Sequence, residues 1–146
     1  MGKVLAEIIV SNYGDVILAE IGTIDKKDIK IVRISDAIVD SGATLLSLSE
    51  NIIRMLGLKK RKSVKVNTAS GVEERGIYDP VVLEIMGREG LFEVMELKHP
   101  EIKALVGQIP LERLDFLIKP SVNRLIPDPD HGNQLILDQL LTDQVL

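Results

Sequence analysis

Residues 37–44 read Ala-Ile-Val-Asp-Ser-Gly-Ala-Thr, an apolar run that ends in an aspartate, a serine and a glycine. The apolar run predicts a buried strand, so Asp40 should lie where that strand leaves the core. A carboxylate in that position loses part of its hydration unless backbone N–H groups meet it. Gly42 permits the tight backbone path that points amides at a carboxylate, and the hydroxyl of Ser41 is a further donor or acceptor. The motif therefore predicts a carboxylate held in an ordered loop.

A single carboxylate cannot hydrolyse an amide, because a water must lose a proton while the scissile carbonyl gains one. This reaction needs a base and an acid held close together, and the chain contains one Asp-Ser-Gly. A twofold dimer supplies the second carboxylate, since a residue on the axis meets its own copy. Two carboxylates this close would share a proton and titrate as a coupled pair. We therefore expect a homodimer with Asp40 of each copy at the axis.

Short runs of Val, Ile and Leu, separated by Gly, Asp, Asn and Pro, surround this loop on both sides. This sequence pattern is typical of a fold with many short strands. The segments expected to be strands are residues 4–10, 15–21, 29–34, 64–68, 76–78, 81–86, 91–97 and 116–118. Residues 69–75 should form the polar tip of a hairpin between two of these strands. The fold class predicted is all-β, a closed barrel.

Helices are expected in three places. The first begins after Ser49, whose side chain caps it, and ends before Gly57. The second covers residues 110–114, with proline at its start. The third is an amphipathic tail over residues 134–146, in which apolar residues recur at helical spacing: Leu137, Leu140, Leu141 and Val145.

The length of 146 residues fits one domain, and a composition of 45% hydrophobic and 27% charged residues is that of a chain with a packed core. The pattern of turn residues places a boundary near Asp128. We expect one domain over residues 1–130 and a tail over residues 131–146.

Four landmarks of the chain resemble those of the retropepsin-like aspartic proteases, in their non-viral prokaryotic branch. Residues 37–44 are similar to the active-site motif of that family, in which apolar residues precede Asp-Thr-Gly or Asp-Ser-Gly. Thr68-Ala69-Ser70-Gly71 resembles the start of the flap hairpin, and Leu105-Val106-Gly107 resembles the element that packs behind the catalytic loop. Residues 111–114 and 125–127 resemble the closing segment of prokaryotic members. The resemblance covers roughly residues 4–130 and implies the closed acid-protease barrel of the family.

The resemblance implies a homodimeric aspartic endopeptidase without a metal or an organic cofactor. One copy of Asp40 would act as general base on water and the other as general acid toward the carbonyl. Ser41 and Gly42 would orient this carboxylate, and Ser41 would also bond across the twofold axis. A polypeptide substrate would bind as an added strand. The remaining site residues implied are the substrate-binding Ala43, Thr44, Ala69, Ser70 and Gly71, and the supporting Val106 and Gly107.

The expected flap departs from viral members, because Glu73, Glu74 and Arg75 stand where those are glycine-rich and apolar. A second function therefore stays open. A catalytically weak or inactive dimer could hold extended peptides or serve assembly without cleaving them. The separation of the two Asp40 carboxylates distinguishes the two functions.

Composition argues against several other classes of protein. The 18 Lys and Arg against 22 Asp and Glu give a net charge of −4, so nucleic acid and membrane are not expected partners. The basic run at residues 59–62 is interpreted as a solvated loop after a helix C-terminus. There is no cysteine, no Gly-x-Ser-x-Gly elbow and no phosphate loop.

His99 and His131 have no partner at metal-ligand spacing, so no metal is assigned to either. The N-terminus, residues 1–10, shows no secretion signal, and no segment is long and apolar enough to span a membrane. The expected location is the cytoplasm.

Overall fold

The computed structural model describes residues 3–141, and its first strand shows how the sequence builds the fold. In β1 (Val4–Asn12), Val4, Ala6, Ile8 and Val10 are buried, and the residues between them are exposed or half-buried. Successive side chains of a strand point to opposite faces, so this alternation gives one apolar face and one polar face. The apolar face turns inward.

The strands of the described residues are β1, β2 (Ile31–Val39), β3 (Leu46–Ser49), β4 (Lys60–Thr68), β5 (Gly71–Ile85), β6 (Arg88–Leu97), β7 (Ala104–Val106), β8 (Phe116–Lys119) and β9 (Arg124–Pro127). The helices are α1 (Tyr13–Glu20), α2 (Glu50–Met55) and α3 (Gln108–Arg113), with single 3₁₀ turns at Lys26–Asp28, Pro120–Val122 and Pro129–His131.

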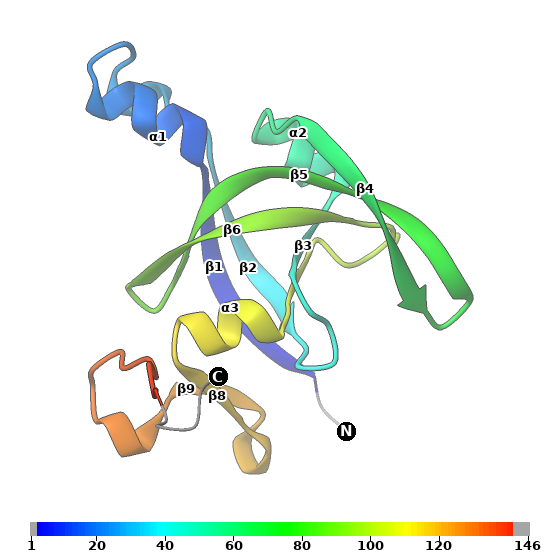
Figure 1. The fold of residues 1–146 in the computed structure, drawn as a ribbon, viewed down its shortest axis with the longest axis vertical. Coiled ribbons are helices and arrows are strands. Elements are labelled where there is room, and N and C mark those ends of the chain that lie inside the picture. Colours follow the sequence, from blue (N-terminus) through cyan, green and yellow to red (C-terminus); the bar gives the residue numbers. More distant parts are fainter. Residues whose placement is uncertain (1–2, 142–146) are drawn as a thin grey trace.

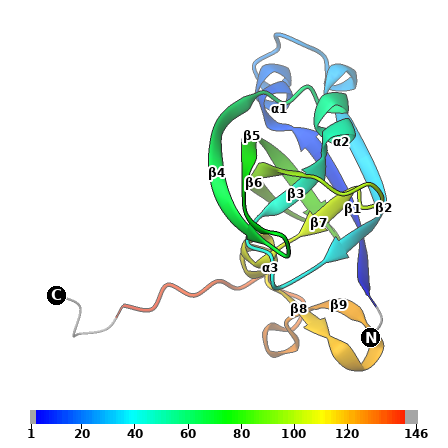
Figure 2. The ribbon, with the colours of Figure 1, turned by 90° about the vertical axis from the view of Figure 1, so that its right-hand side faces the viewer.

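Six strands close into a mixed barrel in the order β1-β2-β7-β3-β6-β5, because β1 also pairs with β5 (Figures 1 and 2). The pairs β2–β7 and β3–β6 are parallel, and the other pairs are antiparallel. Strand β4 pairs with β5 outside the closed ring, and β8 and β9 form a separate two-stranded sheet. The predicted all-β closed barrel is confirmed.

One apolar core fills the barrel, and each of its six strands contributes side chains to it. Burial of these side chains supplies the main driving force for closure. Fully or almost fully buried members include Ile8, Ile34, Leu46, Leu83, Val94 and Val106.

The strand predicted over residues 15–21 is wrong, because this segment forms helix α1. The side chain of Asn12 caps the helix by accepting a hydrogen bond of 3.0 Å from the backbone N–H of Asp15. The Asp15 carboxylate accepts from the backbone N–H of Lys30 at 3.0 Å and pairs with its ammonium at 3.2 Å. A short apolar run does not distinguish strand from helix, and here the cap and the long-range ion pair decide.

Asn12 also links the helix to the barrel, since its amide donates a buried hydrogen bond of 2.7 Å to the carbonyl of Leu56. We expect Asn12→Ala to destabilise the fold by about 2–3 kcal/mol, because it removes the cap and leaves a buried carbonyl without its donor. Thermal unfolding at neutral pH measures the loss. Asn12→Ser keeps a capping oxygen but cannot reach Leu56, so it should recover about 1 kcal/mol. Equal stability of all three proteins would contradict this account.

The structure corrects two other strand assignments. Residues 31–34 of the strand predicted at 29–34 and the apolar run at residues 37–39 belong to the single strand β2. The hairpin turn is limited to Ala69 and Ser70, because residues 71–75 already pair with β4. Glu73, Glu74 and Arg75 therefore lie within β5 and not at the hairpin tip.

The helices predicted after the Asp40 loop and before β8 are confirmed, although α3 begins two residues earlier than predicted. Ser49 caps α2 by accepting from the N–H of Ile52 at 3.4 Å, and Gly57 ends the turn with a φ of 65°. The predicted tail helix is wrong for residues 134–141, which are extended and lead away from the barrel (Figure 2). Its last apolar position, Val145, lies outside the described residues.

The basic run at residues 59–62 is not a loop, because residues 60–62 begin strand β4. Lys60, Arg61, Lys62 and Lys65 are exposed along this strand. Within residues 3–141, no helix has the length and apolar character needed to cross a membrane.

Candidate active site

Asp40 follows directly on β2, at the point where β2 runs parallel to β7. Val39 lies opposite Val106 in this pair, and the N–H of Asp40 donates to the carbonyl of Val106 at 3.0 Å. The hydrogen bonds between β2 and β7 therefore fix the backbone as far as the nitrogen of Asp40. The sequence prediction that Asp40 lies where a core strand ends agrees with this position.

The loop after β2 folds back on the Asp40 carboxylate. Gly42 N–H donates to Asp40 Oδ1 at 2.8 Å, and Ala43 N–H donates to the Asp40 carbonyl at 3.1 Å. Asp40, Ser41 and Gly42 are all exposed in the single chain. The carboxylate is thus oriented by the backbone, while its other oxygen remains open to water or to a second molecule.

Gly107 supports this loop from behind, because its position leaves no room for a side chain. A Cβ at Gly107 would lie 2.5 Å from the carbonyl oxygen of Leu45 and 2.7 Å from that of Ala43. Its φ of −90° is open to any residue, so the requirement for glycine is a matter of contact and not of backbone strain. The neighbouring Val106 is completely buried.

The first turn of α3 holds the same loop by hydrogen bonds. Gln108 N–H donates to the Ala43 carbonyl at 2.7 Å, and Ile109 N–H donates to the Thr44 carbonyl at 2.9 Å. The free N–H groups of a helix start are thereby satisfied by the loop. As a result, the loop, β7 and α3 form one hydrogen-bonded unit.

A cleft of about 510 Å³ separates this loop from the β4–β5 hairpin. Residues 42–45 line one side and residues 65–68 line the other, with Arg75 of β5 and residues 95–98 completing the wall. The structure thus brings Gly42, Ala43 and Thr44 together with the base of the hairpin. Ala69 and Ser70, in the hairpin turn that projects beyond the barrel (Figure 1), and Gly71, the first residue of β5, lie farther out and do not line the cleft.

The hairpin turn is organised by Thr68. Its hydroxyl lies 2.9 Å from the Gly71 carbonyl and 2.7 Å from Glu73 Oε2, and accepts from the Ser70 N–H at 3.1 Å. The hydrogen bond from Thr68, together with the ion pair to Arg75, lowers the pKa of the Glu73 carboxyl. Thr68 and Arg75 were not expected at the site. For Arg75, which lies in β5, the alternation of side chains along a strand is the pattern that identifies such an inward residue.

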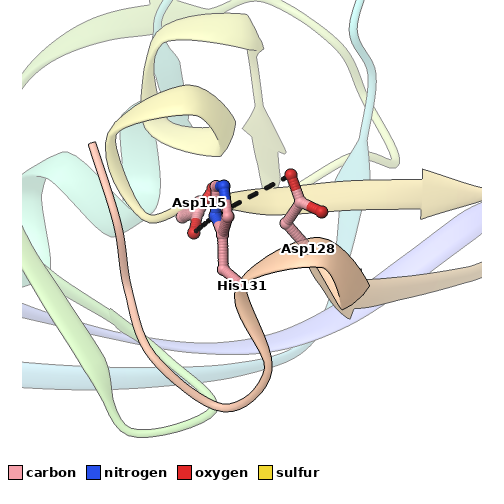
Figure 3. Close-up of side chains that lie close together, drawn as sticks. All are labelled: Asp115, Asp128 and His131. Carbon is pink, nitrogen blue, oxygen red and sulfur yellow. Dashed lines mark hydrogen bonds and ion pairs between the residues drawn. The ribbon is translucent and has the colours of Figure 1, made fainter. Parts of the chain in front are cut away.

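A second group of titratable side chains lies at the sheet of β8 and β9, where Asp115, Asp128 and His131 could each offer a ligand atom within 4.8 Å of the others (Figure 3). His131 Nδ1 lies 2.6 Å from Asp115 Oδ2 and 3.8 Å from Asp128 Oδ2. Asp115 Oδ2 also accepts from the Ile136 N–H at 3.1 Å. The hydrogen bonds already account for this arrangement, which ties the start of the tail to β8.

This cluster makes stability depend on pH. The hydrogen bond to Asp115 raises the pKa of His131 above 6.5, so its contribution is complete below that value and is lost as the pH rises through the raised pKa. Hydrogen bonds from His131 and the Ile136 N–H lower the pKa of Asp115 below 3.8, so its contribution is lost only as the pH falls through the lowered pKa. The pair therefore stabilises the fold most between these two ordinary values.

We expect His131→Gln to lower the melting temperature more at about pH 5 than at about pH 9, because the charged form of the histidine, which the hydrogen bond to Asp115 favours, is lost as the pH rises through its raised pKa. Melting curves of both proteins across this range measure the difference. A loss of equal size at both pH values would show that the charge of His131 does not contribute.

The chain was also compared with known proteins. A family model described as aspartyl protease matches residues 22–120, which include the Asp40 loop, the β4–β5 hairpin and Gly107. A search of the curated proteins found no match.

Proposed function

The chain belongs to the retropepsin-like aspartyl protease family, and from this premise we propose that it is a homodimeric aspartic endopeptidase with Asp40 of both copies at its catalytic centre. Proteases of this family act on polypeptides. The observation that carries the proposal is the Asp40 carboxylate, held at one oxygen by the Gly42 N–H and exposed on the surface of the single chain.

A twofold axis beside this loop would complete the site. Each chain supplies one Asp40, and the reaction needs two carboxyl groups in different protonation states. Two carboxylates held close together share one proton, so one copy remains a base and the other an acid. Ser41 is exposed beside Asp40 and is available to bond to the partner loop.

The proposed reaction is the addition of water to a peptide carbonyl. The ionised Asp40 takes a proton from the water as the oxygen attacks the carbonyl carbon, and the protonated Asp40 gives its proton to the carbonyl oxygen. The Asp40 that took the water proton then gives it to the amide nitrogen as the C–N bond breaks, and one hydroxyl of the diol returns its proton to the other Asp40, which leaves a carboxylic acid and an amine. The substrate would lie as an extended strand in the cleft, and the hairpin residues Ala69, Ser70 and Gly71 would reach it by closing.

A peptide-binding or assembly dimer without activity is the second candidate function. It is favoured by the position of the hairpin turn, because Ala69, Ser70 and Gly71 do not line the cleft in this chain. If the turn does not close in the dimer, peptides would be held without being cut. Both functions require peptide binding, but only the protease releases cleaved peptides.

The test is digestion of a mixed peptide library from about pH 3.5 to 7, with the mass in solution measured on the same preparation. Asp40→Asn protein purified in parallel controls for contaminating proteases. We expect new peptide termini in the wild-type digest alone, a bell-shaped pH profile and the mass of a dimer. A stable dimer that cuts nothing at any pH would favour the binding module, and a strict monomer would overturn the shared-proton mechanism.

A further inference from the structure

The cleft beside the Asp40 loop differs in charge from the rest of the chain. The whole chain carries a net charge of −4. The residues that line the cleft, by contrast, include the cations Lys65, Arg75 and Lys98 and a single carboxylate, Glu96. A cleft with an excess of one sign concentrates the field and selects ligands of the opposite sign.

Arg75 is the best positioned of these cations, since only 11% of its side chain is exposed. Its Nη1 donates to the Glu74 carbonyl at 2.9 Å and pairs with Glu73 Oε1 at 3.0 Å. Both contacts hold the guanidinium through one nitrogen. A guanidinium fixed in this way can bind a second carboxylate with little further loss of side-chain entropy.

The negative groups near Arg75 are already engaged. Glu96 Oε1 accepts from the backbone N–H of Gly76 at 2.8 Å. Glu73 binds Thr68 as well as Arg75, and it is not among the residues that line the cleft. Lys65 and Lys98 are exposed at the rim, and neither forms an ion pair with another residue in the described part of the chain.

Between these charges, part of the cleft wall is apolar. It includes Val66, Met95, Leu97 and Leu105, all partly buried. An apolar wall accommodates the methylene groups of a long side chain, while the cations bind its end group. Glutamate satisfies both features better than aspartate, which has one methylene fewer.

We propose that this cleft is a specificity subsite for an acidic substrate side chain, glutamate before aspartate, with Arg75 as the principal binding residue and Lys65 and Lys98 as rim cations. The proposal rests on the proposed function, since it takes the substrate to be a peptide lying beside Asp40. It adds the chemical class of the residue that the protease selects.

Three sets of peptides test this preference. They share random flanking residues and carry Glu, Gln or Lys at each position in turn, and they are digested at about pH 6, where glutamate is ionised. We expect the best position to show kcat/KM at least about tenfold higher for Glu than for Gln, because a desolvated cation discriminates strongly against a neutral isostere. The preference should shrink with added salt and as the pH falls toward the pKa of free glutamate.

Variants identify the residues responsible. Arg75→Gln should reduce the Glu over Gln ratio to about one to three, and Lys65→Gln combined with Lys98→Gln should reduce it in part. The double variant keeps Arg75 and its contacts, so it remains informative if Arg75→Gln unfolds. Arg33→Gln is the matched control, because Arg33 is exposed and pairs with Glu7 on the β1–β2 surface, outside the residues that line the cleft.

The outcomes separate this proposal from the proposed function. Cleavage with no preference for Glu at any position overturns the acidic subsite but supports the proposed protease function. If wild type cleaves nothing, the binding of the same peptide sets is measured directly by fluorescence anisotropy. Selective binding of the Glu peptides would then support the acidic subsite and overturn the proposed protease function. Equal binding of all three sets would overturn both proposals.

Discussion

The kcat/KM of Asp40→Asn protein should be at least about a thousandfold lower than that of the wild type on any substrate found in the library digest. An asparagine amide can neither accept a proton from water nor share one with the partner carboxyl. Its carbonyl oxygen can still accept the hydrogen bond that Gly42 N–H gives to Asp40 Oδ1 at 2.8 Å, so the loop should keep its shape. Melting temperature and solution mass should therefore remain those of the wild type.

Asp36→Asn is the matched control, because Asp36 is also exposed and lies in β2, the strand that leads to Asp40. It should retain full activity. Retention of full activity by Asp40→Asn would remove Asp40 from the mechanism.

Mixing tests whether both copies are needed. When equal amounts of wild-type and Asp40→Asn chains reassociate at random, about a quarter of the dimers carry two intact carboxyl groups. Activity per total protein should therefore fall to about a quarter of the wild-type value. A fall to one half would mean that each Asp40 works alone.

Gly107→Ala should reduce kcat/KM by at least about a hundredfold, since displacement of a catalytic group by about 1 Å has an effect of that size. The added Cβ would lie 2.5, 2.7 and 2.8 Å from backbone atoms of Leu45, Ala43 and Thr44, respectively. Backbone atoms cannot rotate away as a side chain does, so the loop that carries Asp40 must shift. We also expect a loss of about 1–3 kcal/mol of folding free energy from overpacking.

Gly14→Ala provides the comparison for this substitution. Gly14 is exposed in α1, and the atom that a Cβ would meet there is a side-chain oxygen of Asn12 at 3.2 Å. Its activity should equal that of the wild type. Kinetics and thermal melts of both alanine variants measure the contrast, and a fully active Gly107→Ala would show that the loop tolerates displacement.

The barrel and the position of Asp40 could be predicted from the sequence because both depend on local patterns. Alternating burial in β1 and the apolar run before Asp40 each occupy a few consecutive residues. Helix α1 could not be predicted in this way. Its formation depends on Asp15 meeting Lys30 and on Asn12 meeting Leu56, contacts between residues far apart in the chain.

The same limit applies to the site. The sequence prediction placed Arg75 at the hairpin tip, because the extent of the turn depends on the register of β4 against β5. The grouping of Asp115 with His131 was missed for a similar reason, since the two residues meet only when β8 and β9 pair. Residue spacing along the chain does not contain this information.

Strand β4 is the last strand of the large sheet, and its edge has a consequence for the protein in concentrated solution. Its outer edge has no strand beside it in the described part of the chain, and an open edge can recruit an identical strand from another molecule and begin aggregation. Lys60, Lys62 and Lys65 lie along this strand. Pairing of two such edges would bring like charges together, so the lysines should prevent edge-to-edge association of two molecules. Specific self-assembly would then use other surfaces of the protein.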